Sequence, residues 1–328
     1  MWSSIASRLW AKNPTEEVAP TPQQSLRKSS GQERTYFKQV RWSPDGQCLL
    51  TNSADATLRL YPLASQTLAE ETQWEAGTVL THAETVHDVV WYPFMTTELP
   101  ATCCFFVASR EHPIQLRDAY TCANRASYIY VDHRERMVAP YALAVNSDVT
   151  KLVGTCDASI VLFDVQRPGT ECTVVKTSPK RKSREGQKSV LSCIDFAPNA
   201  EALFAVGAYD RSIWLYEARQ NKRLLKLGGK QKTGVTQVKF SDDGLHLFSA
   251  GRQDNVLSVW DIRQTAKCVA QCPRAGKTNQ RLQFDARGDL LVTGDTQGQL
   301  LLYHWKKDEK MLLSSWQAHD GLFSIFHF

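Results

Sequence analysis

Three arginines occupy equivalent places in a repeated pattern of short strands, and their chemistry is the most informative in this sequence. Arg110, Arg211 and Arg252 each follow a short run of apolar and small residues and lie in a polar turn. A guanidinium group binds phosphate through paired hydrogen bonds and stacks on unpaired bases. Tyr209, close to Arg211, adds a ring of the kind on which single-stranded bases stack. These residue types favour contact with a nucleic acid.

Further cations fall in the segments that join one repeat to the next, namely Lys230, Lys277 and Arg281. In a stack of antiparallel strands, consecutive turns alternate between two faces, so these segments and the three arginine turns are expected on one face. The net charge of +5 is compatible with an acidic partner. Each arginine can alternatively form an ion pair within the fold, and that reading stays open.

Four aspartates, Asp55, Asp157, Asp210 and Asp254, recur in the same turn of four different repeats. A carboxylate in a tight turn accepts backbone N–H groups and holds the neighbouring strands in register. We therefore expect these four residues to have a structural role.

Catalytic patterns are missing from the sequence. It contains no H-E-x-x-H, no G-x-S-x-G and no G-x-x-x-x-G-K. The eight histidines lack metal-ligand spacing, and the nine cysteines form no C-x-x-C pair, so buried thiols are expected. No apolar run approaches 18 residues. We expect no enzymatic activity, no cofactor, no metal, no membrane association and no small-molecule substrate.

The arginines and aspartates are positioned by a repeat whose clearest copy is Val235–Gln264. It predicts three short strands, with a first turn at Ser241–Gly244, a second at Gly251–Asn255, and an end at Trp260-Asp261. The residue before the first turn recurs at positions 42, 91, 145, 196, 240 and 284, which are 44 to 54 residues apart. This period with several strands per unit is typical of an all-β WD-repeat propeller.

The repeat also predicts the domain boundaries. Residues 1–34 lack a strand pattern and are expected to form a flexible leader, and residues 35–328 are expected to form the propeller. Gly321–Phe328 resembles the first strand of a further blade, which predicts a seven-bladed ring whose last blade is incomplete in this chain. A six-bladed ring closed by the N-terminal segment together with Gly321–Phe328 is the alternative.

Blade three is predicted to end at Arg167–Gly169, before a basic insertion at residues 176–188. Within it, Lys180, Arg181 and Lys182 have the form of a nuclear import signal. The alternative is a solvated loop between two blades.

Several sequence motifs are more specific than those of generic WD repeats. Ser109–Ile114, Tyr209–Ser212, and Gly251–Asp254 with Trp260–Gln264 resemble blades two, four and five of the telomerase Cajal body protein 1 family. The similarity covers roughly Phe37 to Tyr303. Lys230 departs from it, because the family pattern has a histidine after Gly-Gly.

The resemblance implies RNA binding in the nucleus. It implies recognition of a loop motif in box H/ACA-type small Cajal body RNAs, with telomerase RNA as a further candidate, and retention of the ribonucleoprotein in Cajal bodies. It also implies a chaperone that assists folding of the ring. The competing hypothesis is a protein-interaction scaffold, an adaptor in splicing or chromatin complexes. The scaffold predicts that the arginines are bridged to aspartates, whereas RNA binding predicts that they converge and stay largely unpaired.

Overall fold

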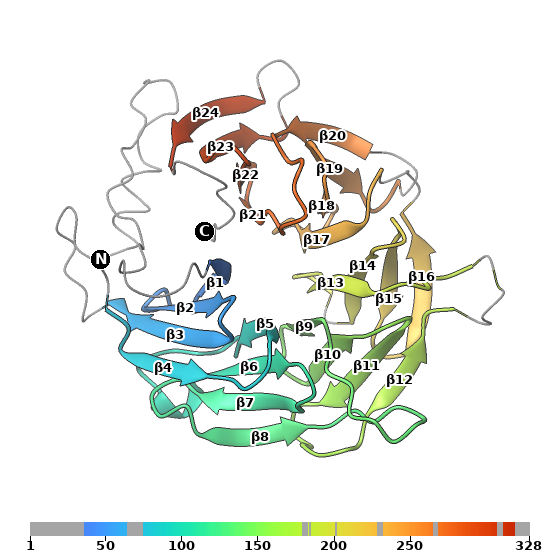
Figure 1. Ribbon diagram of the computed structural model, residues 1–328. Coiled ribbons are helices and arrows are strands. Elements are labelled where there is room, and N and C mark those ends of the chain that lie inside the picture. The colour runs from blue at the N-terminus through green and yellow to red at the C-terminus, as the bar shows by residue number, and fades with distance from the viewer. Residues whose placement is uncertain are drawn as a thin grey trace.

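The structure is a computed structural model that describes residues 36–63, 75–178, 183, 185–200, 202–227, 232–264, 268–306 and 311–318. In these ranges, six antiparallel sheets of four strands each surround a common centre (Figure 1). Each sheet is one blade. The predicted all-β WD-repeat propeller is therefore confirmed as the fold class.

The first three blades run from Phe37 to Lys176. Blade one contains β1 (Phe37–Trp42), β2 (Cys48–Ser53), β3 (Thr57–Pro62) and β4 (Thr78–Thr81). Blade two contains β5 (Val86–Trp91), the short 3-10 helix η2 (Pro100–Thr102), β6 (Cys104–Ser109), β7 (Ile114–Asp118) and β8 (Asn124–Tyr128). Blade three contains β9 (Ala142–Val145), β10 (Lys151–Thr155), β11 (Ser159–Asp164) and β12 (Thr173–Lys176).

The next three blades run from Leu191 to Gln317. Blade four contains β13 (Leu191–Phe196), β14 (Leu203–Ala208), β15 (Ile213–Glu217) and β16 (Lys222–Lys226). Blade five contains β17 (Val235–Phe240), β18 (His246–Gly251), β19 (Val256–Asp261) and β20 (Cys268–Pro273). Blade six contains β21 (Phe284–Arg287), β22 (Leu290–Gly294), β23 (Gln299–His304) and β24 (Leu312–Gln317).

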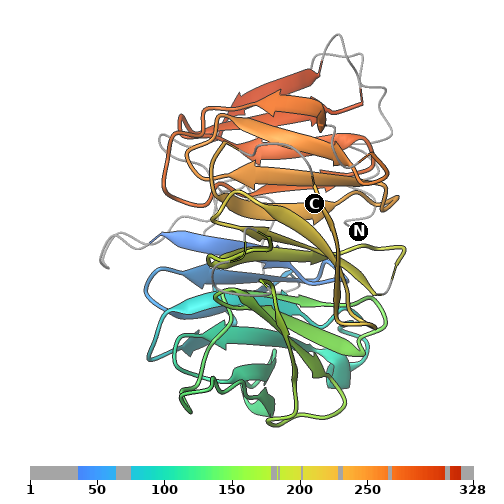
Figure 2. The same ribbon diagram turned by 90° about the vertical axis from the view of Figure 1, so that its right-hand side faces the viewer.

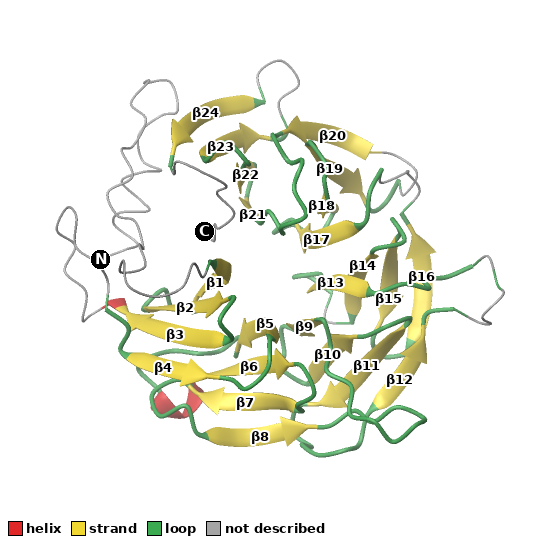
Figure 3. Ribbon diagram, in the orientation of Figure 1, coloured by secondary structure: helices red, strands yellow, loops and turns green. Residues whose placement is uncertain are grey.

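The first strand of each blade lies nearest the centre and the fourth at the periphery (Figure 1). Strands run across the thickness of the disc, so turns gather at its two faces (Figure 2). Almost all of the regular structure among the described residues consists of strands (Figure 3). The short helix η2 lies in the connection between β5 and β6 of blade two.

The hydrophobic core lies between neighbouring blades. One cluster joins Phe106 and Tyr128 of blade two to Phe163 of blade three, and another joins Leu215 of blade four to Trp260 of blade five. These side chains are almost completely buried. Because a blade covers its apolar faces only against its neighbours, the ring rather than the single blade is the stable unit.

Polar side chains also link the innermost strands of successive blades. Asp88 accepts the backbone N–H of Leu143 at 2.8 Å, and Asp195 accepts that of Phe240 at 2.7 Å. Gln237 bonds both the backbone N–H and the carbonyl of Phe284. We call Asp88, Asp195 and Gln237 the inner belt. Their hydrogen bonds connect neighbouring blades, whereas the backbone hydrogen bonds between strands stay within each sheet.

The tight turns formed where the sequence predicted them in blade five. Ser241 Oγ lies 2.5 Å from a carboxylate oxygen of Asp243, and Gly244 follows with a φ of +65°. Glycine adopts this left-handed conformation without the steric cost that a Cβ imposes. The same arrangement recurs in blade one at Ser43, Asp45 and Gly46.

Two sequence expectations about strand boundaries are wrong. Blade three does not end at Arg167–Gly169, because β12 follows at Thr173–Lys176 and pairs with β11. In blade six, residue 284 opens the first strand instead of closing it, since β21 is Phe284–Arg287. Both errors arose where the alternation of apolar and polar residues is weak.

Closure of the ring stays a prediction. Blades six and one are separated by a sector in which no described strand lies (Figure 1). The strand predicted at Gly321–Phe328 and the leader at residues 1–34 lie outside the described residues. In the described part, no helix is long and apolar enough to cross a membrane.

Candidate nucleic-acid interface

The arginine turns and the blade-to-blade connections lie on one face of the disc, which we call the turn face. The backbone N–H of Arg110 donates to Thr85 O, that of Tyr209 to Val190 O, and that of Arg252 to Gly234 O, at 2.7–3.0 Å. Each acceptor belongs to the connection that enters the same blade. Each turn is therefore fixed against the chain segment beside it.

In blades four and five, each second-to-third-strand turn also contacts the connection that leads into the next blade. Gly234 packs so closely on Tyr209 that a Cβ on the glycine would lie 3.1 Å from Tyr209 Cα. Arg252 Nε donates to Asn279 Oδ1 at 3.1 Å, in the connection to blade six. We call Tyr209, Arg211, Arg252 and Asn279 the rim. The rim is a row of polar and aromatic side chains along the turn face.

The rim side chains are directed to solvent. Tyr209 is 44 % exposed, and Arg211 and Arg252 are exposed as well. Among the described residues, neither arginine forms an ion pair with an aspartate or a glutamate. Arg110 pairs with Glu111 at 3.4 Å, but both side chains are more than 60 % exposed, so water and salt weaken this pair.

The remaining predicted cations do not all join the rim. Lys277 is exposed in the connection to blade six. Arg281 is half-buried, and its charge affects the pKa of Arg41 on β1, so it lies toward the inner strands. Lys230 and the predicted import signal Lys180, Arg181 and Lys182 lie outside the described residues.

The four turn aspartates have different surroundings. Asp55 and Asp210 each accept the backbone N–H of the residue two positions later at 3.1 Å, and Asp55 also binds Arg59 at 3.2 Å. Asp254 is buried. Asp157 is exposed and accepts the Tyr141 hydroxyl at 3.4 Å. The expected hydrogen bond from a backbone N–H of the same turn is therefore present at two of the four aspartates, Asp55 and Asp210.

The repeat pattern did not reveal three residues of the turn face, His87, Tyr141 and Asn279. The rings of His87 and Tyr141 stack at 5.4 Å across the junction of blades two and three. No signal in the sequence indicated the bond between Asn279 and Arg252. The contacts depend on how blades pack, which a period along the chain does not encode.

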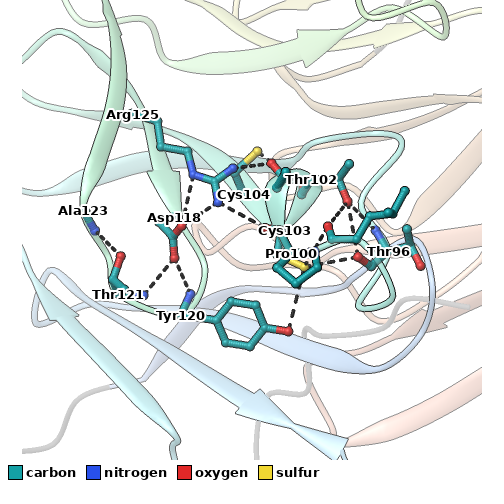
Figure 4. Close-up of polar contacts among 12 residues, drawn as sticks. Thr96, Pro100, Thr102, Cys103, Cys104, Asp118, Tyr120, Thr121, Ala123 and Arg125 are labelled. Atoms are coloured by element: carbon teal, nitrogen blue, oxygen red, sulfur yellow. Dashed lines mark hydrogen bonds and ion pairs between the residues drawn. The ribbon is translucent and has the colours of Figure 1, made fainter.

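The opposite face carries a different arginine site. Arg125 on β8 binds Asp118 through Nε and Nη2 at 3.0 and 2.5 Å, and it donates to the carbonyls of Pro100 and Ala101 (Figure 4). It thereby pins the insertion that contains η2 to the end of β7. We call this the Arg125 clamp.

Hydrogen bonds lower the pKa of Asp118 in this clamp. Burial alone would raise it, but the backbone N–H of Thr121, the Arg125 guanidinium and the backbone N–H of Tyr120 outweigh burial and bring the pKa to about 2. Neither here nor elsewhere in the described ranges do three His, Cys, Asp or Glu side chains gather as metal ligands. The nine cysteines are free thiols, most of them buried.

Comparison with known proteins supports the assignment of the repeats. The family model described as "WD domain, G-beta repeat" matches residues 23–61 and 221–261. Human telomerase Cajal body protein 1 is 36 % identical over 276 residues, or 82 % of this chain and 50 % of the relative.

More distant relatives agree over a similar range. The Drosophila melanogaster telomerase Cajal body protein 1 homolog is 29 % identical over 85 % of this chain and 52 % of its own length. The guanine nucleotide-binding protein negative regulator 1 of Schizosaccharomyces pombe is 26 % identical over 87 % of the chain and 73 % of its own length. The chain spans about half the length of the telomerase Cajal body proteins that it matches. The chain is thus a WD-repeat propeller protein homologous to telomerase Cajal body protein 1.

Proposed function

We propose that this chain is a non-enzymatic RNA-binding WD-repeat protein that acts in the nucleus. It recognises a loop motif of box H/ACA-type small Cajal body RNAs, with telomerase RNA as a further candidate, and directs the particle to Cajal bodies. A folding chaperone assists assembly of the ring. The names of the human and Drosophila relatives, telomerase Cajal body protein 1 and its homolog, support the nuclear body and a link to telomerase.

The rim is the observation that carries the proposal. Two exposed arginines without acidic partners among the described residues flank an exposed tyrosine, and Asn279 orients one of the arginines. Guanidinium groups suit phosphates, and an exposed ring suits an unpaired base. The scaffold hypothesis expected aspartate bridges at these arginines, and the described contacts give it no support there.

Salt-dependent binding of purified protein tests the proposal. If about six phosphates are contacted, affinity for a single-stranded RNA should fall on the order of a thousandfold between 50 and 200 mM salt. Crosslinking and sequencing of RNA bound in cells should enrich box H/ACA-type RNAs. Enrichment of no RNA class, together with salt-independent binding in solution, would reject the proposal.

A second candidate, protein docking, is favoured by the face opposite the rim. Phe94, Leu99 and Tyr120 are each more than half exposed around the insertion held by the Arg125 clamp. A fixed loop that presents large apolar side chains is suited to a protein partner. A Leu99→Asp, Tyr120→Ser double variant should then lose nuclear partners that resist RNase while keeping its RNA affinity.

A further inference from the structure

A second group of polar side chains lies on the turn face where blades two and three meet. His87 is the second residue of the inner strand β5, Tyr141 precedes β9, and Asp157 lies in the turn between β10 and β11. The two rings stack at 5.4 Å with 25° between their planes, and the tyrosine hydroxyl lies 3.4 Å from Asp157 Oδ2. Three elements thus bring these side chains into one row.

The hydrogen bonds determine what this row offers to a ligand. His87 Nδ1 lies 3.0 Å from the carbonyl oxygen of Pro140, which can only accept, so Nδ1 carries the proton. Burial, with the charges of Lys38 and Arg110, lowers the pKa of His87 despite the Pro140 bond and Asp88. The ring is therefore neutral near pH 7, and its Nε2 is an acceptor. Tyr141 donates to Asp157, which leaves carboxylate lone pairs available.

Asp157 differs from the aspartates of the equivalent turns. Asp55 and Asp210 accept backbone N–H groups from their own turns, and Asp295 of blade six does so twice, at 2.8 Å. Within the described chain, the Tyr141 hydroxyl is the hydrogen-bond donor to the Asp157 carboxylate. The carboxylate is exposed and is not needed to close its turn. It is available to accept hydrogen bonds from a ligand.

Arg110 supplies a cation at the same junction. Its side chain is 63 % exposed, and its positive charge acts on both the His87 and the Tyr141 groups. Its backbone N–H bonds Thr85 O, just before β5, which fixes the turn beside His87. The row therefore combines hydrogen-bond acceptors with an adjacent phosphate-binding group.

We propose that His87, Tyr141, Asp157 and Arg110 form a subsite for an unpaired guanine of the bound RNA. Guanine presents two adjacent donors, N1–H and the N2 amino group, which match the two oxygens of one carboxylate. Adenine, cytosine and uracil each place an acceptor beside their Watson–Crick donor, and that acceptor would face Asp157. Arg110 binds a neighbouring phosphate. The inference rests on the proposed RNA binding and adds base selectivity to it.

Fluorescence anisotropy with the full chain tests this subsite. The probes are labelled uridine oligomers of about 12 nucleotides that carry a single central guanosine, inosine or adenosine. Guanosine should bind about tenfold more tightly than adenosine, within the range that a single base contact confers. Inosine lacks the N2 amino group and should bind with intermediate affinity.

Variants separate the subsite from general RNA affinity. Asp157→Asn should reduce the guanosine preference to about twofold or less. Glu171→Gln is the matched control, because it removes one exposed carboxylate from the β11–β12 connection on the opposite face, and it should keep the preference. Tyr141→Phe should keep the ring stack and alter the preference only through the lost bond to Asp157. Thermal unfolding of each variant verifies folding.

The outcomes are distinguishable. If the wild-type chain binds none of the oligomers in a salt-dependent manner, both the proposed function and the subsite fail. If it binds all oligomers equally, or if folded Asp157→Asn keeps the guanosine preference, the subsite fails while RNA binding stands. A preference that depends on Asp157 and on the N2 amino group supports the subsite.

Discussion

Two arginine-bearing regions on opposite faces of the disc use the same side chain in opposite ways. In the Arg125 clamp, the guanidinium donates to Asp118 and to two backbone carbonyls, so it is occupied by its own protein. In the rim, Arg211 and Arg252 are exposed and lack acidic partners among the described residues. The difference indicates which arginines stabilise the fold and which are available to a ligand.

The largest effect is expected from removing the clamp. Arg125→Ala removes the guanidinium donor from Asp118 Oδ2 and from two backbone carbonyls, and loss of these charge-assisted hydrogen bonds should lower the free energy of unfolding by about 2 kcal/mol. Urea denaturation measures this change. Arg134→Ala, in an exposed loop, is the control and should change it by less than about 0.5 kcal/mol. Equal losses in both variants would contradict the distinction.

The rim should show the converse behaviour. The double variant Arg211→Ala, Arg252→Ala should weaken RNA binding about tenfold and reduce the slope of log affinity against log salt by about two. Arg167→Ala, an exposed arginine on the opposite face, should leave both quantities unchanged. An RNA affinity that responds to Arg167 as strongly as to the rim would remove the basis for a one-sided interface.

Acid should weaken the clamp selectively. The folded-state pKa of Asp118 is about 2, below its ordinary value, so its stabilisation is complete above pH 4 and declines as the pH falls toward 2. The stability difference between wild type and Arg125→Ala should therefore shrink below pH 4. Chemical denaturation between pH 3 and 6 measures it. A difference that grows on acidification would show that Asp118 is not the partner that matters.

The smallest effect concerns the backbone at the rim. Arg211 has a φ of +71°, a conformation that strains residues with a Cβ. Arg211→Gly should therefore be more stable than Arg211→Ala by about 1 kcal/mol, although both lose the same guanidinium and the same RNA contact. Thermal unfolding compares the two variants. Equal stability would indicate that this turn relaxes freely.

The fold was largely predictable, because turn chemistry repeats in phase along the chain. Ser241, Asp243 and Gly244 form their turn as the sequence indicated, since the hydroxyl, the carboxylate and the positive φ act locally. The strand β12 was missed, because Thr173–Lys176 lies between turn residues and a basic run and shows no alternation. This segment forms a strand because it pairs with β11, and the local sequence pattern does not encode that pairing.

The candidate site was only partly predictable for the same reason. Repeat phase indicated one face for Arg110, Arg211 and Arg252, and the backbone contacts of their turns agree. It gave no indication that Arg281 would point inward or that Asn279 would hold Arg252. Such outcomes depend on side-chain direction and on the packing of neighbouring blades, which a linear period leaves undetermined.

The inner belt has a consequence for how this disc opens. Because Asp88 holds Leu143 N–H and Asp195 holds Phe240 N–H, detachment of one blade must release an amide of its neighbour. Local fluctuations near the axis are then coupled between the blades that share these bonds rather than confined to one sheet. Amide hydrogen exchange at Leu143 and Phe240 would thus report on cooperative units larger than one blade, whereas the peripheral strands should exchange independently.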